Sequence, residues 1–183
     1  RYYRRSSMTQ VQYWARYDIN FHSIMKDIRE ALDDEIPSHY QREKSPHITI
    51  HPRFQFNESE IERFRHYVYE IFPTSIRVDI NGFSYYPNEH QPMVICLDID
   101  TNLEFRSLQQ QLCDKISAEG GKSVLNPAPP HITVYKSKDT GADYRNIPSN
   151  VNQIKTRCRK IGNMKLPITV TETKLKVERA PSQ

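Results

Sequence analysis

Hydrophobic and polar residues alternate along three stretches in the first half of the chain, and this period of two predicts half-buried strands. The stretches are residues 11–19 (VQYWARYDI), 47–54 (HITIHPRF) and 75–83 (SIRVDINGF). Between them, in residues 21–32 and 61–72, apolar side chains recur every three or four positions, which predicts an amphipathic helix in each segment. The first half is therefore predicted to run strand, helix, strand, helix, strand.

The second half repeats this order. Residues 92–100 (PMVICLDID), 131–137 (HITVYKS) and 166–177 (LPITVTETKLKV) have the periodicity of strands. Residues 103–116 and 151–161 have the periodicity of helices. A unit of this length that occurs twice indicates an internal duplication that forms two related lobes, and it does not indicate a solenoid.

Local signals predict where several of these elements begin and end. Thr101 and Glu104 have the spacing of a capping box at the start of a helix. Gly120 is expected to stop that helix, and Gly162 is expected to stop the last one. Asn81–Gly82 predicts a turn or a bulge in the strand that contains it.

The two halves keep a nearly constant offset along the chain. His131 follows His47 by 131 − 47 = 84 residues, and the leading helices are offset by 103 − 21 = 82 residues. We therefore predict a single bilobal domain over residues 11–177, with interleaved lobes built from the repeats 11–86 and 92–177. Two related lobes tend to meet around a shared cleft, and we expect the equivalent strands to face each other across it.

Length, charge and cysteine content limit the function classes. The chain has 183 residues, a length that suits one folding unit, and residues 1–10 are expected to be a disordered segment. Its net charge of +4 suits a partner that carries phosphates, although many proteins are mildly basic. The three cysteines lack a CxxC spacing and are predicted to be reduced core residues. No membrane-spanning stretch or signal peptide is found, so we expect a cytoplasmic protein, with the nucleus as the alternative.

One short pattern, Pro-His-Ile-Thr followed by an aliphatic residue, occurs once in each half. Because strand side chains alternate, His47 and Thr49 share one face, and so do His131 and Thr133. Same-face neighbours lie about 6.6 to 7 Å apart, so an imidazole and a hydroxyl can reach one phosphate-sized group. A single copy is most often a structural strand. Two copies in equivalent positions of a duplicated chain make the signal specific.

Two histidines that face one phosphorus atom can divide the work of hydrolysing a cyclic phosphodiester. One ring takes a proton from water, and the other protonates the departing ribose oxygen on the opposite side of an in-line displacement. The ordinary histidine pKa of about 6.5 allows one ring to be neutral and the other protonated near neutral pH, without a metal. Threonine hydroxyls would donate to the non-bridging oxygens, where charge develops.

These motifs and their spacing resemble the 2H phosphoesterase superfamily, whose LigT-like members include RNA 2',3'-cyclic phosphodiesterases and 2'-5' RNA ligases. The resemblance covers residues 11–177. It implies an α+β, bilobal, duplicated fold with an antiparallel sheet in each lobe, helices on the outside and a central, positively lined cleft. It also implies that His47 and His131 form the acid/base pair and that Thr49 and Thr133 bind the phosphate.

The residues that follow the motifs depart from the family pattern. LigT-like proteins often have an arginine where this chain has Tyr135–Lys136, and Lys136 would supply its charge as a point donor. By strand parity Tyr135 lies on the same face as His131 and Thr133. Three roles are open for it there: contact with phosphate, stacking on a base, or simple packing. By the same parity His51 is expected at the rim or behind the catalytic residues. Arg53 is a candidate to line the cleft, against the alternative of a solvated surface charge.

The sequence does not support a P-loop or a zinc site. The sequence GGKS at residues 120–123 resembles the end of a P-loop, but Ile116 stands where the leading glycine belongs. The remaining histidines include no helical pair at positions i and i+4, so we expect no zinc site, no other metal and no cofactor.

The sequence therefore predicts a monomeric, metal-independent phosphodiesterase that acts on a 2',3'-cyclic phosphate or a 2'-5' linkage at an RNA 3' end or in a small oligonucleotide. Ligation is the reverse of 2'-5' cleavage at the same site, so 2'-5' RNA ligase activity stays open. Two alternatives also stay open. One is a hydrolase of a cyclic or 2'-5' signalling nucleotide, and the other is a non-catalytic RNA-binding module on the same fold.

Overall fold

The computed structural model describes residues 9–20, 22–34, 36, 40–86, 93–137 and 151–181. The first half of the chain contains β1 (Gln10–Ile19), α2 (His22–Leu32), β2 (Tyr40–Arg42), β3 (His47–Asn57), the short 3-10 helix η1 (Glu58–Glu60), α3 (Ile61–Ile71) and β4 (Val78–Tyr86). The second half contains β5 (Val94–Thr101), α4 (Phe105–Ala118), β6 (Lys122–Ser123), β7 (His131–Ser137), α5 (Val151–Lys165), β8 (Ile168–Val170) and β9 (Thr173–Arg179). The predicted alternation of strands and helices is confirmed in the first half, and in the second half as far as α5.

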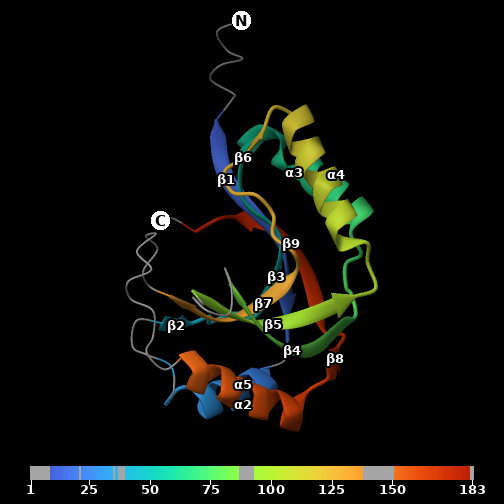
Figure 1. Cartoon of the computed structure of the whole chain (residues 1–183). Coiled ribbons are helices and arrows are strands. Elements are labelled where there is room, and N and C mark those ends of the chain that lie inside the picture. Colours follow the sequence, from blue (N-terminus) through green and yellow to red (C-terminus); the bar gives the residue numbers. More distant parts are fainter. Residues whose placement is uncertain are drawn as a thin grey trace, which may run out of the picture.

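All of the described strands belong to one antiparallel sheet with the order β8-β4-β5-β7-β3-β1-β9, and the short strands β2 and β6 pair with β7 and β3. Among the described residues, β3 and β7 pair at a single position, Ile48 with Ile132. On either side of this junction the strands run in clearly different directions (Figure 1). The two motif strands, expected to face each other across a cleft, instead lie side by side in one curled sheet.

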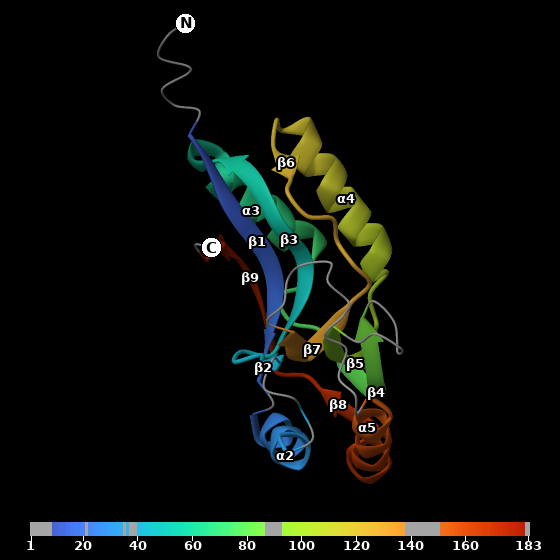
Figure 2. The ribbon, with the colours of Figure 1, turned by 60° about the vertical axis from the view of Figure 1, so that its left-hand side comes forward.

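The junction divides the molecule into two lobes. We call β3, β1, β9 and β6 with α3 and α4 the first lobe, and β7, β5, β4, β8 and β2 with α2 and α5 the second lobe. Helix α2 comes from the first half of the sequence yet packs against α5 in the second lobe, at the lower end of the molecule in Figure 2. The lobes therefore exchange elements between the two halves of the chain.

The hydrophobic periodicity explains which face each element buries. Along β1, the buried residues Tyr13, Ala15, Tyr17 and Ile19 alternate with half-buried ones, and their side chains join the core under α3 and α4. The helices bury one stripe each, such as Ile61, Phe64 and Val68 of α3. None of the helices in the described ranges is long and apolar enough to cross a membrane.

The stretch of residues 166–177 was predicted as one strand, and this prediction is wrong. It forms β8, which pairs with β4, and β9, which pairs with β1, at opposite ends of the strand order. Only Thr171 and Glu172 separate them. Two intervening residues span at most about 10 Å, so the two edges of the sheet must lie close together. Figure 1 shows the resulting curl of the sheet.

Several predicted boundaries also change. Strand β1 begins at Gln10, inside the segment expected to be disordered, while residues 1–8 lie outside the described residues. The capping box is absent, because Thr101 ends β5 and the side chain of Glu104 makes no capping hydrogen bond. Gly120 does follow the end of α4, with a positive φ of 80°. Helix α5, in contrast, continues through Gly162 to Lys165.

Candidate active site

The two motifs occupy equivalent places, since His47 is the first residue of β3 and His131 is the first residue of β7. Burial alternates as predicted: both histidines and both threonines are half-buried, and the isoleucines between them, Ile48 and Ile132, are fully buried. We call the side of the sheet that carries His47, Thr49, His131 and Thr133 the histidine face. In each lobe the helices cover the other side.

The pairing of Ile48 with Ile132 places the two motifs next to each other. In an antiparallel pair, the residues on either side of this position are His47 opposite Thr133 and Thr49 opposite His131. The two histidines are then diagonal neighbours, which in a regular sheet lie about 7–8 Å apart. Two imidazoles and two hydroxyls thus surround one small area of the histidine face.

Both imidazole rings are held in the same way. Nδ1 of His47 lies 2.8 Å from the carbonyl oxygen of Ser45, and Nδ1 of His131 lies 2.8 Å from that of Pro129. A carbonyl oxygen only accepts, so Nδ1 carries the proton in both rings and Nε2 is the nitrogen left for chemistry. In the described part of the chain, neither Nε2 has a hydrogen-bond partner. A proline precedes each histidine, so the repeated Pro-His accompanies the same anchoring of the ring in both motifs.

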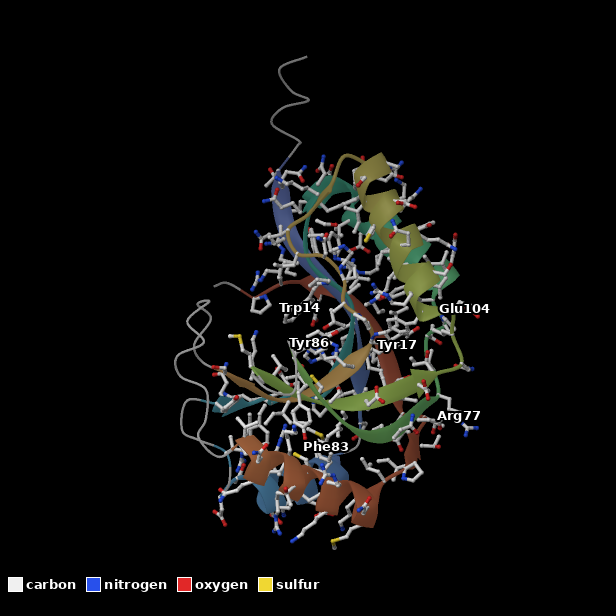
Figure 3. All side chains as sticks on the ribbon, in the orientation of Figure 1. Trp14, Tyr17, Arg77, Phe83, Tyr86 and Glu104 are labelled. Atoms are coloured by element: carbon white, nitrogen blue, oxygen red, sulfur yellow. The ribbon has the colours of Figure 1, made fainter. Side chains whose placement is uncertain are left out.

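An aromatic ring from another strand lies beside each histidine. The rings of Trp14 and His47 are 6.4 Å apart with an interplanar angle of 34°, and those of Tyr86 and His131 are 5.2 Å apart at 34°. Trp14 comes from β1 in the first lobe and Tyr86 from β4 in the second, and Figure 3 shows their labels close together near the centre of the molecule. The sequence prediction missed both residues. Trp14 could have been found, because it is a tryptophan at a polar position of an alternating strand.

The first lobe surrounds its threonine with charges. Arg16 is the cross-strand partner of Thr49, and its guanidinium lies 4.7 Å from the ring centroid of Trp14. Arg16 Nε is 3.0 Å from Asp18 Oδ1, and Arg16 Nη2 is 3.1 Å from Glu178 Oε1. Trp14 Nε1 donates to the same Glu178 oxygen at 3.3 Å. Glu178 therefore holds both the guanidinium and the indole, and neither Arg16 nor Glu178 was predicted as a site residue.

The second lobe surrounds its threonine with neutral groups. Cys96 is the cross-strand partner of Thr133, and the two side chains share a hydrogen bond. Burial raises the pKa of the Cys96 thiol to about 12, against a smaller lowering by Thr133, so this thiol stays protonated near neutral pH. Cys96 and Arg16 thus occupy equivalent positions, one neutral and the other positively charged.

Both motif strands contain a β-bulge directly after the threonine. On β3 the partners step from Thr49–Arg16 to His51–Ala15, so Ile50 is an extra residue. On β7 they step from Thr133–Cys96 to Tyr135–Ile95, so Val134 is an extra residue. A bulge reverses the alternation of side chains beyond it. The residues that follow each bulge therefore point away from the face that strand parity predicts.

His51 and Tyr135 are the two residues turned inward by these bulges. His51 is fully buried, with Nδ1 2.6 Å from the Pro52 carbonyl oxygen and Nε2 3.0 Å from Ser123 Oγ. Burial lowers the pKa of His51, against a smaller raising by the Pro52 hydrogen bond, which favours the neutral ring. His51 is thus a core residue behind the site and not a rim residue.

The expectation that Tyr135 shares the histidine face is wrong. Tyr135 is 2% exposed, and its hydroxyl donates to Asp33 beyond the end of α2, on the helix side of the second lobe. Burial raises its pKa to about 12. The bulge instead brings Lys136, which is exposed, to the histidine face. We therefore no longer assign Tyr135 a contact with substrate.

Arg53 is held away from the motifs. Its Nη1 donates to Gln12 Oε1 at 3.1 Å, and its Nη2 donates to the carbonyl oxygen of Pro181. These contacts tie β3 to the beginning of β1 and to the segment after β9. Lys136 is therefore the better of the two basic candidates predicted from the sequence.

The segment that leads into each histidine is connected by hydrogen bonds to the bulge of the other motif strand. The buried side chain of Gln109 on α4 donates 3.0 Å hydrogen bonds to the carbonyls of Ile50, at the first bulge, and Ala128, three residues before His131. In the other direction, the backbone amide of Glu43, four residues before His47, donates to the carbonyl of Val134, at the second bulge. Each bulge carbonyl lacks a ladder partner and is satisfied in this way.

A family model of the 2'-5' RNA ligase superfamily matches residues 22–157, which is most of the chain and includes both motifs. The chain belongs to the 2'-5' RNA ligase superfamily. This is a group of 2H phosphoesterases, so the family predicted from the two motifs is confirmed. A search of curated protein sequences finds no match.

Solved structures of the same superfamily share the fold at low sequence identity. The MHV ns2 PDE domain is 12% identical with a TM-score of 0.51, and the match covers 93% of this chain and 99% of that one. TT0787 of Thermus thermophilus is 15% identical with a TM-score of 0.51, covering 91% and 84%. Usb1 of Kluyveromyces marxianus is 14% identical with a TM-score of 0.53, covering 97% of both chains. The chain thus has the α+β fold of 2H phosphoesterases over nearly its whole length.

Proposed function

We propose that this 2H phosphoesterase hydrolyses a 2',3'-cyclic phosphate or a 2'-5' phosphodiester on RNA or a small oligonucleotide, with His47 and His131 as the acid/base pair. The observation that carries the proposal is the equivalent anchoring of the two rings. Each Nδ1 is occupied by a backbone carbonyl, and each Nε2 is left on the histidine face. A pair of diagonal neighbours suits a phosphorus atom between the two rings.

The reaction needs one proton acceptor and one proton donor on opposite sides of the phosphorus. Nε2 of the neutral ring takes a proton from water as the water oxygen bonds to phosphorus. Nε2 of the protonated ring gives a proton to the departing ribose oxygen as the P–O bond breaks. A cyclic phosphate and water thus yield a phosphomonoester and a free ribose hydroxyl. Thr49 and Thr133 donate hydrogen bonds to the non-bridging oxygens, with Lys136 as a further source of positive charge.

The surroundings of the histidines support a nucleotide as the substrate. Trp14 and Tyr86 present aromatic rings next to the motifs, and nucleobases stack on such rings. A polar hollow of about 460 Å³ adjoins the start of β3, lined in part by Asp18, Ser45 and Lys174. A hollow of this size has room for a sugar. Among the similar structures, that of Usb1 was obtained with uridine monophosphate.

The test is a hydrolysis panel with the purified chain. It contains nucleoside 2',3'-cyclic phosphates, RNA that ends in a 2',3'-cyclic phosphate, 2'-5'-linked oligoadenylates and 3'-5'-linked controls. His47→Ala and His131→Ala are each expected to lower turnover by about 10² to 10⁴, or roughly 3 to 5 kcal/mol, through loss of the general acid or base. His66→Ala, on the exposed side of α3, is the matched control and should keep wild-type turnover.

Three results would decide against the proposal. Unchanged hydrolysis in both histidine variants would remove the acid/base pair. Salt-dependent RNA binding without turnover of any substrate would identify a non-catalytic binding module instead. Loss of turnover in EDTA would contradict a mechanism in which two imidazoles carry both protons.

A further inference from the structure

A second groove lies in the second lobe, on the side of the sheet opposite to the histidines. It has a volume of about 480 Å³ and runs between α5 and β4. Phe83 and Tyr85 line it from β4, while the residues that alternate with them, Ser84 and Tyr86, belong to the histidine face. Figure 3 shows Phe83 between the strands of the second lobe and α5. The groove is therefore separate from the candidate active site, although one strand borders both.

The charge of α5 favours an anionic ligand. The helix contains five basic residues and no Asp or Glu: Lys155, Arg157, Arg159, Lys160 and Lys165. Lys155 and Arg159 line the groove, and none of the described residues that line it is acidic. Arg157 donates to the carbonyl of Ala31, and Lys165 lies 3.6 Å from Asp27. Arg159 is exposed and has no hydrogen bond or ion pair within the described residues, so its guanidinium is available to a phosphate.

The floor of the groove favours flat, unsaturated groups. Phe83 and Tyr85 are half-buried and lie on the same side of β4, about 6.6 to 7 Å apart along the strand. Gly162 of α5 faces Phe83, and among the described residues a Cβ added there would meet a single side-chain atom within 4 Å, Phe83 Cδ2 at 3.9 Å. The glycine thus leaves the ring of Phe83 uncovered. At the same wall Asn163 adds an exposed amide that can donate to and accept from a base edge.

Aromatic rings below basic side chains, without carboxylates, form the combination that binds single-stranded nucleic acid. Bases stack on the rings, and the phosphates contact Lys and Arg. We propose that the groove between α5 and β4 binds a single-stranded nucleic acid, with bases on Phe83 and Tyr85 and a phosphate on Arg159. The identification of this nucleic acid as RNA rests on the proposed function. Tyr86 of the same strand contacts His131 on the other face, so β4 borders both the groove and the second motif.

The test measures binding separately from hydrolysis. A labelled single-stranded RNA dodecamer with an ordinary 3'-hydroxyl is titrated by fluorescence anisotropy, next to the same DNA sequence and an RNA duplex of equal length. Arg159→Glu is expected to weaken single-strand binding about tenfold and to lower the salt slope by roughly 0.7 for the lost phosphate contact. Lys122→Glu, the same charge change on exposed β6 of the first lobe, should weaken it less than about twofold.

A second variant separates stacking from charge. Gly162→Leu keeps the charge of α5 and favours the helix, but it places a side chain over Phe83. It should weaken single-strand binding about tenfold, the loss expected when base stacking is removed. Circular dichroism and thermal unfolding check that the variant is folded, and Gly162→Ala serves as the small-residue control with near wild-type binding.

The outcomes distinguish this groove from the active site. Two results would contradict binding in the groove: equal weakening of single-strand binding by Arg159→Glu and Lys122→Glu, or equal affinity for the duplex. Either result would indicate general charge attraction instead. Unchanged binding in a folded Gly162→Leu would contradict the stacking of bases on Phe83. Hydrolysis of a mononucleoside cyclic phosphate, too short to reach the groove, should be unchanged in Arg159→Glu. If no substrate is hydrolysed by wild type but the binding pattern appears, the proposed function fails and the groove stands.

Discussion

In the first lobe, the carbonyl oxygen at the bulge accepts a hydrogen bond from a side chain, Gln109, whereas in the second lobe the equivalent carbonyl accepts one from a backbone amide, that of Glu43. Gln109 also donates to Ala128 and so holds the segment that leads into His131, and the bond from Glu43 holds the segment that leads into His47. A backbone donor is present whatever residue stands at position 43, apart from proline. The hydrogen bonds that position His131 therefore depend on one side chain, and the hydrogen bond that positions His47 does not.

Removing the side-chain hydrogen bonds should have the largest effect. Gln109→Leu leaves the carbonyls of Ile50 and Ala128 without their donor and allows the segment before His131 to shift. We expect kcat/KM for a cyclic phosphate to fall about 10- to 100-fold, because displacements near 1 Å cost this much in positioned catalysis. Glu43→Ala, which keeps the amide, is the matched control and should stay within about twofold. Equal losses in the two variants would contradict this difference between the hydrogen bonds of the two lobes.

The next largest effect is expected on the stability of the fold, at the place where the segment after α4 contacts β3. A Cβ at Gly121 would lie 2.7 Å from the backbone oxygen of Gln55 and 2.8 Å from Phe56 Cδ1, so Gly121→Ala forces the segment after α4 away from β3. The free energy of unfolding should fall by about 1–3 kcal/mol, as for other overpacked sites. Gly82→Ala in the second lobe, where a Cβ meets no atom of the described part of the chain within 4 Å, should change it by less than about 0.5 kcal/mol. Denaturant titrations give both values, and equal stabilities would show that the close approach is not required.

The charged and neutral surroundings of the two threonines can be compared directly. Arg16→Met removes the guanidinium opposite Thr49 and leaves the carboxylates of Asp18 and Glu178 beside the phosphate position. We expect kcat/KM to fall about tenfold, the loss typical of a hydrogen bond to a charged group. Cys96→Ala, at the equivalent place in the second lobe, should lower it less than about threefold. Steady-state kinetics on one substrate suffices, and a larger loss in Cys96→Ala would reverse the assignment of the charged lobe.

The smallest expected effect is the pH dependence of stability that arises from His51 and Tyr135, the two residues turned inward by the bulges. Burial lowers the pKa of His51 in the folded chain, whereas in the unfolded chain this histidine binds a proton near its ordinary pKa of about 6.5. Because the folded-state pKa of His51 is lowered, stability should fall as the pH drops below about 6.5. Tyr135 has a raised pKa of about 12, so its contribution should be lost only as the pH rises above about 10.

His51→Gln tests the acid limb of this comparison. The amide keeps a donor and an acceptor near Ser123 and Pro52 but does not titrate, so the decline of the unfolding free energy between about pH 7 and pH 5 should become shallower. Tyr135→Phe should leave that acid limb unchanged. An unchanged slope in His51→Gln would mean that another group controls the loss of stability in acid.

The alternation of residues was enough to predict most strands and helices and the shared face of His47 and Thr49. These features depend on a local period, which a short stretch of chain contains completely. Trp14 was also within reach, since it stands at a polar position of β1. Arg16, Gln109 and Glu178 were not, because their roles depend on partners far away along the chain.

The duplication, the two motifs and the superfamily could be inferred from the sequence because equivalent residues recur at a constant offset and carry recognisable chemistry. The bulges after Thr49 and Thr133 could not, since a bulge is a mismatch of register between two strands and appears only when both are paired. For this reason Tyr135 was assigned to the wrong face. The division of residues 166–177 into β8 and β9 has the same origin, because the closeness of the two sheet edges is a property of the curled sheet and not of either strand.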